Sequence, residues 1–192
     1  MESEEDEFAR SIGERVRALR NERGLTLDRV AEMSGVSRAM ISRIERAETS
    51  PTAVLLARLC SALGLSLSVF FDTATGASEP LARRVDQPVW RDPESGYLRR
   101  VVGPPGTGSR IDVVEVEFPP AAEVHFGSQP ASRSQWQHVW LFEGEMELVV
   151  GERIYRLAAG DCLHMNVGEV HAFRNPTDKP ARYAVVIDLG QR

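Results

Sequence analysis

Almost all basic side chains in this sequence are arginines: of 23 basic residues, only Lys179 is a lysine. An arginine guanidinium can hold a phosphate through two parallel hydrogen bonds, so this bias suits phosphate recognition, although genome composition explains it equally well. Residues 8–71 hold ten arginines and six acidic residues, whereas residues 1–7 and 72–192 are net acidic. Any contact with nucleic acid is therefore expected within residues 8–71, even though the whole chain has a net charge of −5.

The cysteines and the N-terminus bear on the compartment in which the chain works. Cys60 and Cys162 lie far apart and do not form the Cys-x-x-Cys spacing of a redox or zinc motif. We expect both to be small core residues in a reducing compartment. Residues 1–7 are acidic, whereas a secretory signal begins with basic residues. No apolar run approaches the roughly 20 residues of a membrane span, so a cytoplasmic protein is predicted.

Apolar spacing in residues 8–71 predicts a compact helical domain. Ile12, Val16 and Leu19 recur at intervals of four and three, as on one face of a helix. Thr26 and Ser37 are residue types that cap helix N-termini, and each precedes a further helical pattern. Five helices with short connections are predicted: one around residues 12–19, two over residues 27–33 and 38–46, one between Pro51 and Gly64, and one over residues 66–70.

Residues 25–45 have the pattern of two short helices that cross steeply at a tight turn. Ala31 is small enough to let the helices approach, and Gly35 can take the positive φ that the turn needs. This segment resembles the helix-turn-helix of XRE-type regulators, which are related to the phage repressors, and the similarity covers about residues 10–72. It implies an all-α, five-helix, lambda-repressor-like DNA-binding domain. The shared core would be formed by Val30, Val36, Ile41 and Ile44.

The resemblance also implies which residues contact DNA. The second helix of the motif would enter the major groove, where an arginine can bond guanine at two atoms. The pattern departs from many relatives at Leu27, where they have glutamine. Arg20 and Glu45 match positions that form a buried ion pair in similar repressors. A helical bundle whose arginines only face solvent is the alternative, but it leaves the match of the whole helical pattern unexplained. The implied DNA contacts are Thr26, Ser37, Arg38, Ala39, Met40, Ser42, Arg43 and Arg46.

The pattern changes after Asp72. Residues 73–79 are small and mostly polar, which is typical of a linker. Beyond them, short runs rich in Val, Ile, Tyr and Trp alternate with Pro and Gly, which predicts an antiparallel sandwich or barrel. The predicted strands cover residues 97–102, 111–118, 137–142, 146–150, 154–157, 162–165 and 182–187.

Residues 160–175 resemble the second sequence motif of the cupins. The motif runs Gly, five residues, Pro, one residue, Gly, two residues, His, three residues, Asn, and only Asn166 departs from it, in place of Pro. Residues 137–145 resemble the end of the first cupin motif, with a strand that leads into a Glu-Gly turn at Gly144. The resemblance covers roughly residues 83–190 and implies an all-β double-stranded β-helix of jelly-roll type with an internal cavity.

A metal-bearing cupin supplies a His-x-His pair and a Glu from the first motif and one His from the second. Here Gln137 stands at the Glu position, and the His-x-His positions fall near Ala131 and Arg133. Only His171 matches. One imidazole and a neutral amide make a poor site for a divalent transition metal, so we expect no metal and no cofactor.

Other histidines offer a rearranged metal set as an alternative. His125, His138 and His164 could in principle contribute, although His138 is adjacent to Gln137 and the two would face opposite sides of a strand. A cavity without metal can still bind a small organic effector between aromatic faces and a few polar groups. By strand parity and motif position, the candidate effector-pocket residues are Trp136, Gln137, Trp140, His164, His171 and Arg174.

Three classes of function are compatible with this organisation. A DNA-binding transcriptional regulator, most simply a repressor, with a cupin sensor needs the basic helical motif, which is present. A metal-dependent cupin enzyme of dioxygenase or isomerase type needs the metal ligands, which are missing, and an antitoxin-like scaffold needs a protein partner. We therefore expect a regulator rather than an enzyme.

The expected partners are a palindromic DNA operator, a second copy of the chain and a small-molecule effector. No membrane partner is expected. The predicted division is an acidic disordered tail over residues 1–7, a DNA-binding domain over 8–72, a linker over 73–82, and a cupin sensor and dimerisation domain over 83–190. The linker is expected to leave the spacing of the two DNA-binding domains of a dimer adjustable.

Overall fold

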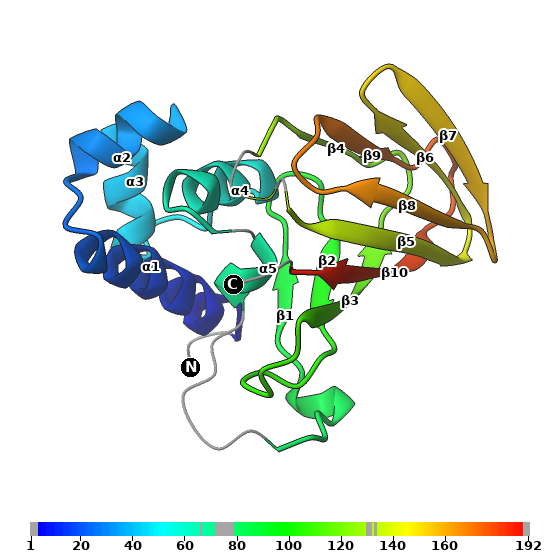
Figure 1. The fold of residues 1–192 in the computed structure, drawn as a ribbon, viewed down its shortest axis with the longest axis horizontal. Coiled ribbons are helices and arrows are strands. Elements are labelled where there is room, and N and C mark those ends of the chain that lie inside the picture. The colour runs from blue at the N-terminus through cyan, green and yellow to red at the C-terminus, as the bar shows by residue number, and fades with distance from the viewer. Residues whose placement is uncertain (1–3, 66, 72–78, 130–131, 133, 190–192) are drawn as a thin grey trace.

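The computed structural model describes residues 4–65, 67–71, 79–129, 132 and 134–189. Within this part of the chain, helices occupy the N-terminal third and strands the remainder (Figure 1). The predicted combination of an all-α domain and an antiparallel β-sandwich is confirmed. The helices are α1 (Glu4–Glu22), α2 (Leu27–Ser34), α3 (Arg38–Glu45), α4 (Ala53–Ala62) and α5 (Leu67–Phe71), followed by the short 3-10 helix η1 (Arg84–Asp86).

Short polar side chains begin the central helices. The hydroxyls of Thr26 and Ser37 each accept a hydrogen bond from the amide three residues further on, at 3.1 and 3.2 Å. Thr52 does the same for α4, so Pro51 lies just before this helix rather than inside it. Gly35 ends α2 with φ of 65°, which is the left-handed conformation expected at the turn.

The acidic N-terminus differs from its prediction. Residues 1–7 were expected to be a disordered tail, but α1 begins at Glu4. The helix dipole favours negative charge near a helix N-terminus, so an acidic run is compatible with the first turn. Residues 1–3 lie outside the described residues.

The strands form two antiparallel sheets that pack face to face (Figure 1). One sheet has six strands in the order β1-β2-β3-β10-β5-β8, and the other has four in the order β4-β9-β6-β7. The strands are β1 (Val89–Arg91), β2 (Leu98–Val101), β3 (Ile111–Phe118), β4 (Glu123–Phe126), β5 (Trp136–Glu143), β6 (Glu145–Val150), β7 (Arg153–Ala158), β8 (Cys162–Asn166), β9 (His171–Arg174) and β10 (Ala181–Asp188).

Seven of these strands overlap the predicted ones, whereas β1, β4 and β9 were not predicted. The three missed strands are only three or four residues long, which is too short for an alternating pattern to stand out from neighbouring loops.

Two residues of the cupin-like motifs have clear structural roles. Gly144 turns the chain between β5 and β6 with φ of 83°, and a Cβ there would lie 2.8 Å from the carbonyl oxygen of Pro180. Asn175 is buried, and its Nδ2 donates to the carbonyl oxygens of Pro119 and Lys179 at 3.0 and 2.7 Å. Both residues therefore shape loops of the sandwich.

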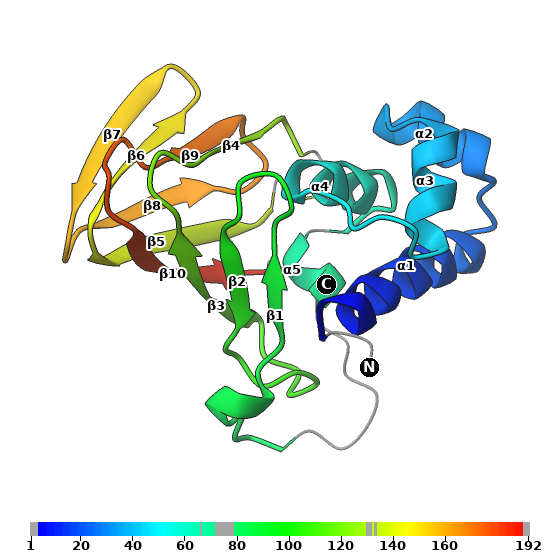
Figure 2. The ribbon, with the colours of Figure 1, turned by 180° about the vertical axis from the view of Figure 1, so that it is seen from behind.

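The helices pack directly against the sandwich. Asp92 follows β1 and is 2% exposed, and its Oδ1 accepts a hydrogen bond of 2.7 Å from the Ala53 amide at the start of α4. The ring of Phe71 in α5 lies 5.8 Å from the indole of Trp90 in β1. Figure 2 shows α5 beside β1 from behind. The Asp92–Ala53 hydrogen bond and the Phe71–Trp90 ring contact thus join the helices to the sandwich.

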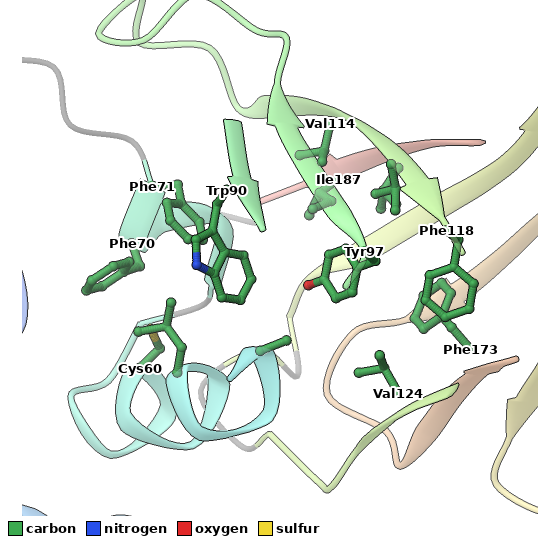
Figure 3. Packing of buried hydrophobic residues seen from close by; sticks show 14 of the residues in the cluster. Cys60, Phe70, Phe71, Trp90, Tyr97, Val114, Phe118, Val124, Phe173 and Ile187 are labelled. Carbon is green, nitrogen blue, oxygen red and sulfur yellow. The ribbon is translucent and has the colours of Figure 1, made fainter. Parts of the chain in front are cut away.

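Aromatic rings continue this contact into the sandwich (Figure 3). Ring centroids are 5.9 Å apart from Trp90 to Tyr97, 6.0 Å from Tyr97 to Phe118, and 6.2 Å from Phe118 to Tyr183. One hydrophobic cluster therefore extends from the helices into the β-domain. The linker was expected to leave the spacing of the two DNA-binding domains of a dimer adjustable, but within one chain this buried contact holds the helices against the sandwich. Residues 72–78 of that linker lie outside the described residues.

The two cysteines have different environments. Cys60 is buried in α4, and burial raises the pKa of its thiol far above the ordinary range. Cys162 is exposed at the start of β8, so its prediction as a core residue is wrong. No helix among the described residues is long and apolar enough to cross a membrane.

Candidate functional site

The predicted recognition helix, α3, turns one face to solvent. Arg38, Ala39 and Arg43 are exposed, whereas Met40 and Ser42 are half-buried. Ile41 and Ile44 on the opposite face are buried in the core. The caps hold this helix and its partner α2 at the turn, so the guanidinium groups of Arg38 and Arg43 are presented to solvent from a rigid element.

Acidic neighbours differ among these arginines. Arg38 Nε lies 3.2 Å from Asp28 Oδ1 in α2, and both side chains are well exposed. Arg46, just after α3, donates to both carboxylate oxygens of Glu48, at 2.6 and 3.0 Å, and also to the hydroxyl of Ser42. Among the described residues, Arg43 makes no ion pair within 4.0 Å. Arg43 is therefore the arginine of α3 most directly available to a ligand.

Thr26 and Ser37 use their hydroxyls to cap their own helices. Their helix N-termini still present backbone N–H groups, which suit a phosphate. Thr26 and Ser37, the two predicted phosphate contacts, are thus the N-cap residues of α2 and α3.

Arg20 and Glu45 form the predicted ion pair. Arg20 Nε and Nη2 donate to the two carboxylate oxygens of Glu45 at 2.6 and 2.8 Å, and Nη1 donates to the Leu25 carbonyl at 2.9 Å. The side chains are only 14% and 7% exposed. The hydrogen bonds to Glu45 raise the pKa of Arg20, so the guanidinium stays charged. This mostly buried pair joins α1 to α3.

A partly open cavity of about 70 Å³ lies between the two sheets of the β-domain. Aromatic and aliphatic side chains form most of its wall, and Leu67 of α5 closes one side. Among the described residues, the polar and charged side chains in this wall are Tyr97, Arg99, Gln129, Gln135, Gln137, His171 and Tyr183.

Gln137 and His171, two predicted pocket residues, face this cavity. Both are buried, at 5% and 4% exposure. The imidazole of His171 stacks on the Phe126 ring at a centroid distance of 5.1 Å, and its Nδ1 lies 2.7 Å from the carbonyl oxygen of Glu169. Burial lowers the pKa of His171, because the charged imidazolium is costly away from water. The ring is therefore neutral at pH 7.

Four other predicted pocket residues lie elsewhere. Trp136 and Trp140 are 46% and 49% exposed on the outer face of β5, and His164 is exposed on β8. Trp136 stacks on His164 with a centroid distance of 5.0 Å. Arg174 does not line the cavity and binds Glu123 on the neighbouring strand β4. The prediction was wrong for the two tryptophans because Trp136 and Trp140 lie an odd number of residues from Gln137 and so point to the opposite face of β5.

The alternative metal set is not assembled. His138 and His164 are neighbours on the outer face of the six-stranded sheet, with ring centroids 4.6 Å apart. His125 is exposed on β4 of the other sheet, beside Glu123. No group of three His, Cys, Asp or Glu side chains that could hold a metal occurs in the described part of the chain. Ala131 and Arg133, near the usual His-x-His positions, lie outside it.

Several cavity residues were not singled out from the sequence. Gln135 is 5% exposed, and its Oε1 is buried without a hydrogen-bond partner. Arg99 extends from β2 with its side chain 8% exposed, and its guanidinium lies over the Phe71 ring at 5.5 Å. Strand alternation counted from Gln137 would have excluded Trp136 and Trp140, but no local pattern identifies Arg99 as a cavity residue.

Comparisons with family models agree with both halves of the structure. The helix-turn-helix model matches residues 16–70, and the cupin domain model matches residues 114–187. The first range contains the capped helices around α3, and the second contains most of the cavity wall.

Two curated relatives extend over most of the chain. The HTH-type transcriptional regulator PuuR of Escherichia coli (strain K12) is 28% identical over 166 residues, which cover 85% of this chain and 86% of the relative. The HTH-type transcriptional regulator SutR of the same organism is 25% identical over 195 residues, covering 95% and 97%.

Solved structures show the same fold. A crystal structure of an HTH_3 family transcriptional regulator from Vibrio cholerae superposes with a TM-score of 0.78 at 22% identity and covers 97% of this chain and 99% of that one. The Fe(II) protein HppE has a TM-score of 0.50 at 14% identity, covering 93% and 98%. At these identities, the likeness concerns the fold alone.

Proposed function

Since the chain belongs to the family of helix-turn-helix transcriptional regulators that carry a cupin domain, we propose that it acts as an operator-binding repressor controlled through its β-domain. The proposal starts from DNA binding by this family. The exposed arginines on α3 are the observation that supports the assignment of the DNA contacts. Arg38 and Arg43 read bases, and the start of α2 and α3 at Thr26 and Ser37 holds phosphates. This activity is exercised in the cytoplasm.

Selection from a random DNA duplex pool tests this function without a known operator. The full chain should enrich a two-fold symmetric sequence with half-sites about 34–36 Å apart. The substitution Arg43→Ala should weaken binding to the selected site by about 1–3 kcal/mol and affect random DNA little. Arg17→Ala, at an exposed arginine of α1, is the matched control.

If Arg43→Ala weakens binding to selected and random DNA equally, Arg43 contacts only phosphate. If the chain enriches no sequence, the operator assignment is overturned. A reporter gene placed behind the selected site should lose expression when the chain is present. A rise in expression would contradict repression.

A second copy of the chain is proposed to dock on the outer face of β5 and β8. Trp136, His138, Trp140 and His164 form an exposed aromatic surface there, which we call the outer aromatic surface. Beside it, β8 ends the six-stranded sheet, and its sequence holds no acidic residue, lysine, arginine or proline. An uncharged edge strand next to exposed aromatic rings is a suitable template for antiparallel pairing with its own copy.

Trp140→Glu should dissociate this dimer, because a carboxylate would be buried in the interface. Sedimentation equilibrium should show at least a tenfold higher dissociation constant. Ile154→Glu, at an exposed apolar position of β7, should leave assembly unchanged. A dimer that tolerates Trp140→Glu would contradict the outer aromatic surface as the interface.

The cavity is proposed to bind an effector without a metal, and not to catalyse a reaction. The donor set in the wall supports this, because it contains His171 and Gln137 rather than three imidazoles and a carboxylate. An effector would act on the helices directly, since Leu67 of α5 is part of the wall. Stoichiometric iron, manganese or nickel in the purified protein would contradict the metal-free assignment.

A further inference from the structure

The cavity wall has an unusual balance of charge. Arg99 brings a guanidinium group to it, and no Asp or Glu side chain lines it in the described part of the chain. Arg99 forms an ion pair with Asp112, with 3.9 Å between Nη2 and Oδ2, but Asp112 is not part of the wall. His171 is neutral because burial lowers its pKa. A ligand in this cavity therefore meets a guanidinium, whereas the described wall offers it no carboxylate.

The neutral polar groups add hydrogen-bonding capacity. The side chains of Gln129, Gln135 and Gln137 line the cavity at 7%, 5% and 5% exposure. The buried Oε1 of Gln135 has no hydrogen-bond partner, which is costly unless a ligand or water supplies one. Carboxamides donate as well as accept, so they can complete the hydrogen bonds of a carboxylate and of a polar group beside it.

The rest of the wall restricts the size and nature of the ligand. Rings of Phe118, Phe126 and Phe173 form apolar faces, and the volume is only about 70 Å³. In such surroundings, a charge is screened far less than in water, so the Arg99 guanidinium favours an anion over an ammonium group. A diamine or other cation would lack any carboxylate to pair with in the wall.

From this arrangement we propose that the cavity binds a small carboxylic acid as its anion, with Arg99 holding the carboxylate and the glutamine amides orienting it. This inference rests on the proposed effector role of the cavity and specifies the chemical class of the effector. The guanidinium of Arg99 also lies over Phe71 at 5.5 Å, so the same residue contacts both the ligand and the last helix of the DNA-binding domain.

Three molecules of nearly equal shape test the proposal on the full chain: butyrate, butyramide and butylamine. Each is added at the same millimolar concentration and constant ionic strength, and binding is followed by calorimetry and by the melting temperature. Butyrate should bind at least about tenfold more tightly than butyramide, because hydrogen bonds to a charged group are the stronger ones. Butylamine should not bind.

Variants assign the preference to one side chain. Arg99→Gln should abolish the difference between butyrate and butyramide, and Arg99→Lys should retain part of it. Arg100→Gln is the control, because Arg100 is next along β2 but contacts Glu115 outside the cavity. Gln137→Leu should weaken butyrate binding without a change of charge, and it covers the case in which Arg99→Gln does not fold.

The outcomes separate this inference from the proposed function. Butylamine binding as well as butyrate, no butyrate binding by the folded chain, or equal effects of Arg99→Gln and Arg100→Gln would each overturn the carboxylate assignment. If the chain selects an operator but does not bind butyrate, only the carboxylate assignment is contradicted. If it binds butyrate but selects no DNA, the carboxylate assignment stands and the operator-binding function is contradicted.

Discussion

Two ion pairs near the recognition helix share their chemistry but differ in their surroundings. Arg20 and Glu45 are 14% and 7% exposed, whereas Arg46 and Glu48 are 53% and 48% exposed. Water screens the second pair, so such a pair contributes little to stability. The first pair has lost most of its hydration, and either charge left alone would be strongly unfavourable.

We therefore predict that Glu45→Ala destabilises the fold by roughly 3 kcal/mol, because the Arg20 guanidinium stays buried without its carboxylate. Glu48→Ala should destabilise the fold far less, because water screens this exposed pair. Urea unfolding of both variants, followed by circular dichroism, measures the two differences. Similar small losses would mean that Arg20 regains enough water to do without Glu45.

At the scale of elements, α1 crosses α3 at a glycine. A Cβ on Gly13 would lie 2.3 Å from the backbone carbonyl oxygen of Ile44, which cannot move without distorting α3. The contact brings the helices close enough for Arg20 to reach Glu45. The small residue in α1 is thus part of the geometry that positions the recognition helix.

Gly13→Ala should destabilise the chain by about 1–3 kcal/mol, although alanine favours a helix, because the added methyl forces α1 and α3 apart. Gly127→Ala adds the same methyl where nothing lies within 4 Å and should change stability little. Thermal unfolding compares the two variants. A stabilised Gly13→Ala protein would show that the helix crossing can widen at low cost.

At the scale of the whole molecule, one hydrophobic core joins helices and sandwich. Trp90 lies at its centre, 4% exposed between Phe71 of α5 and Tyr97 of the β-domain. The Asp92 bond to α4 lies on the same boundary. The two domains should therefore unfold together.

Calorimetry of the full chain should show one unfolding transition. Trp90→Ala should remove roughly 3–5 kcal/mol of packing at the boundary and split the transition into two. Trp136→Ala makes the same change at an exposed indole and should leave a single transition, even if it loosens the dimer. Two transitions in the unmodified chain would show that the contact is too weak to couple the domains.

Local chemistry was enough to predict the five helices and seven of the ten strands in the described part of the chain. Thr26, Ser37 and Gly35 mark the ends of helices by hydrogen bonds and backbone angles that involve only nearby residues, and each lies where expected. The Arg20–Glu45 pair and the turn at Gly144 followed from the family pattern in the same way. The residues implied to contact DNA remain predictions: Arg38, Ala39 and Arg43 are exposed on α3, Met40 and Ser42 are half-buried there, and the other three lie at helix ends.

Most of the cavity wall, the outer aromatic surface and the domain contact became visible only in the tertiary structure. Arg99 and Gln135 line the cavity because the two sheets pack around them. Phe71 contacts Trp90 although the predicted linker separates these residues in the sequence. A strand pattern shows that its residues alternate between two faces, but the face toward the core depends on where the second sheet packs. That choice is made by contacts between segments far apart in the chain, which is why Trp140 was expected inside and lies outside.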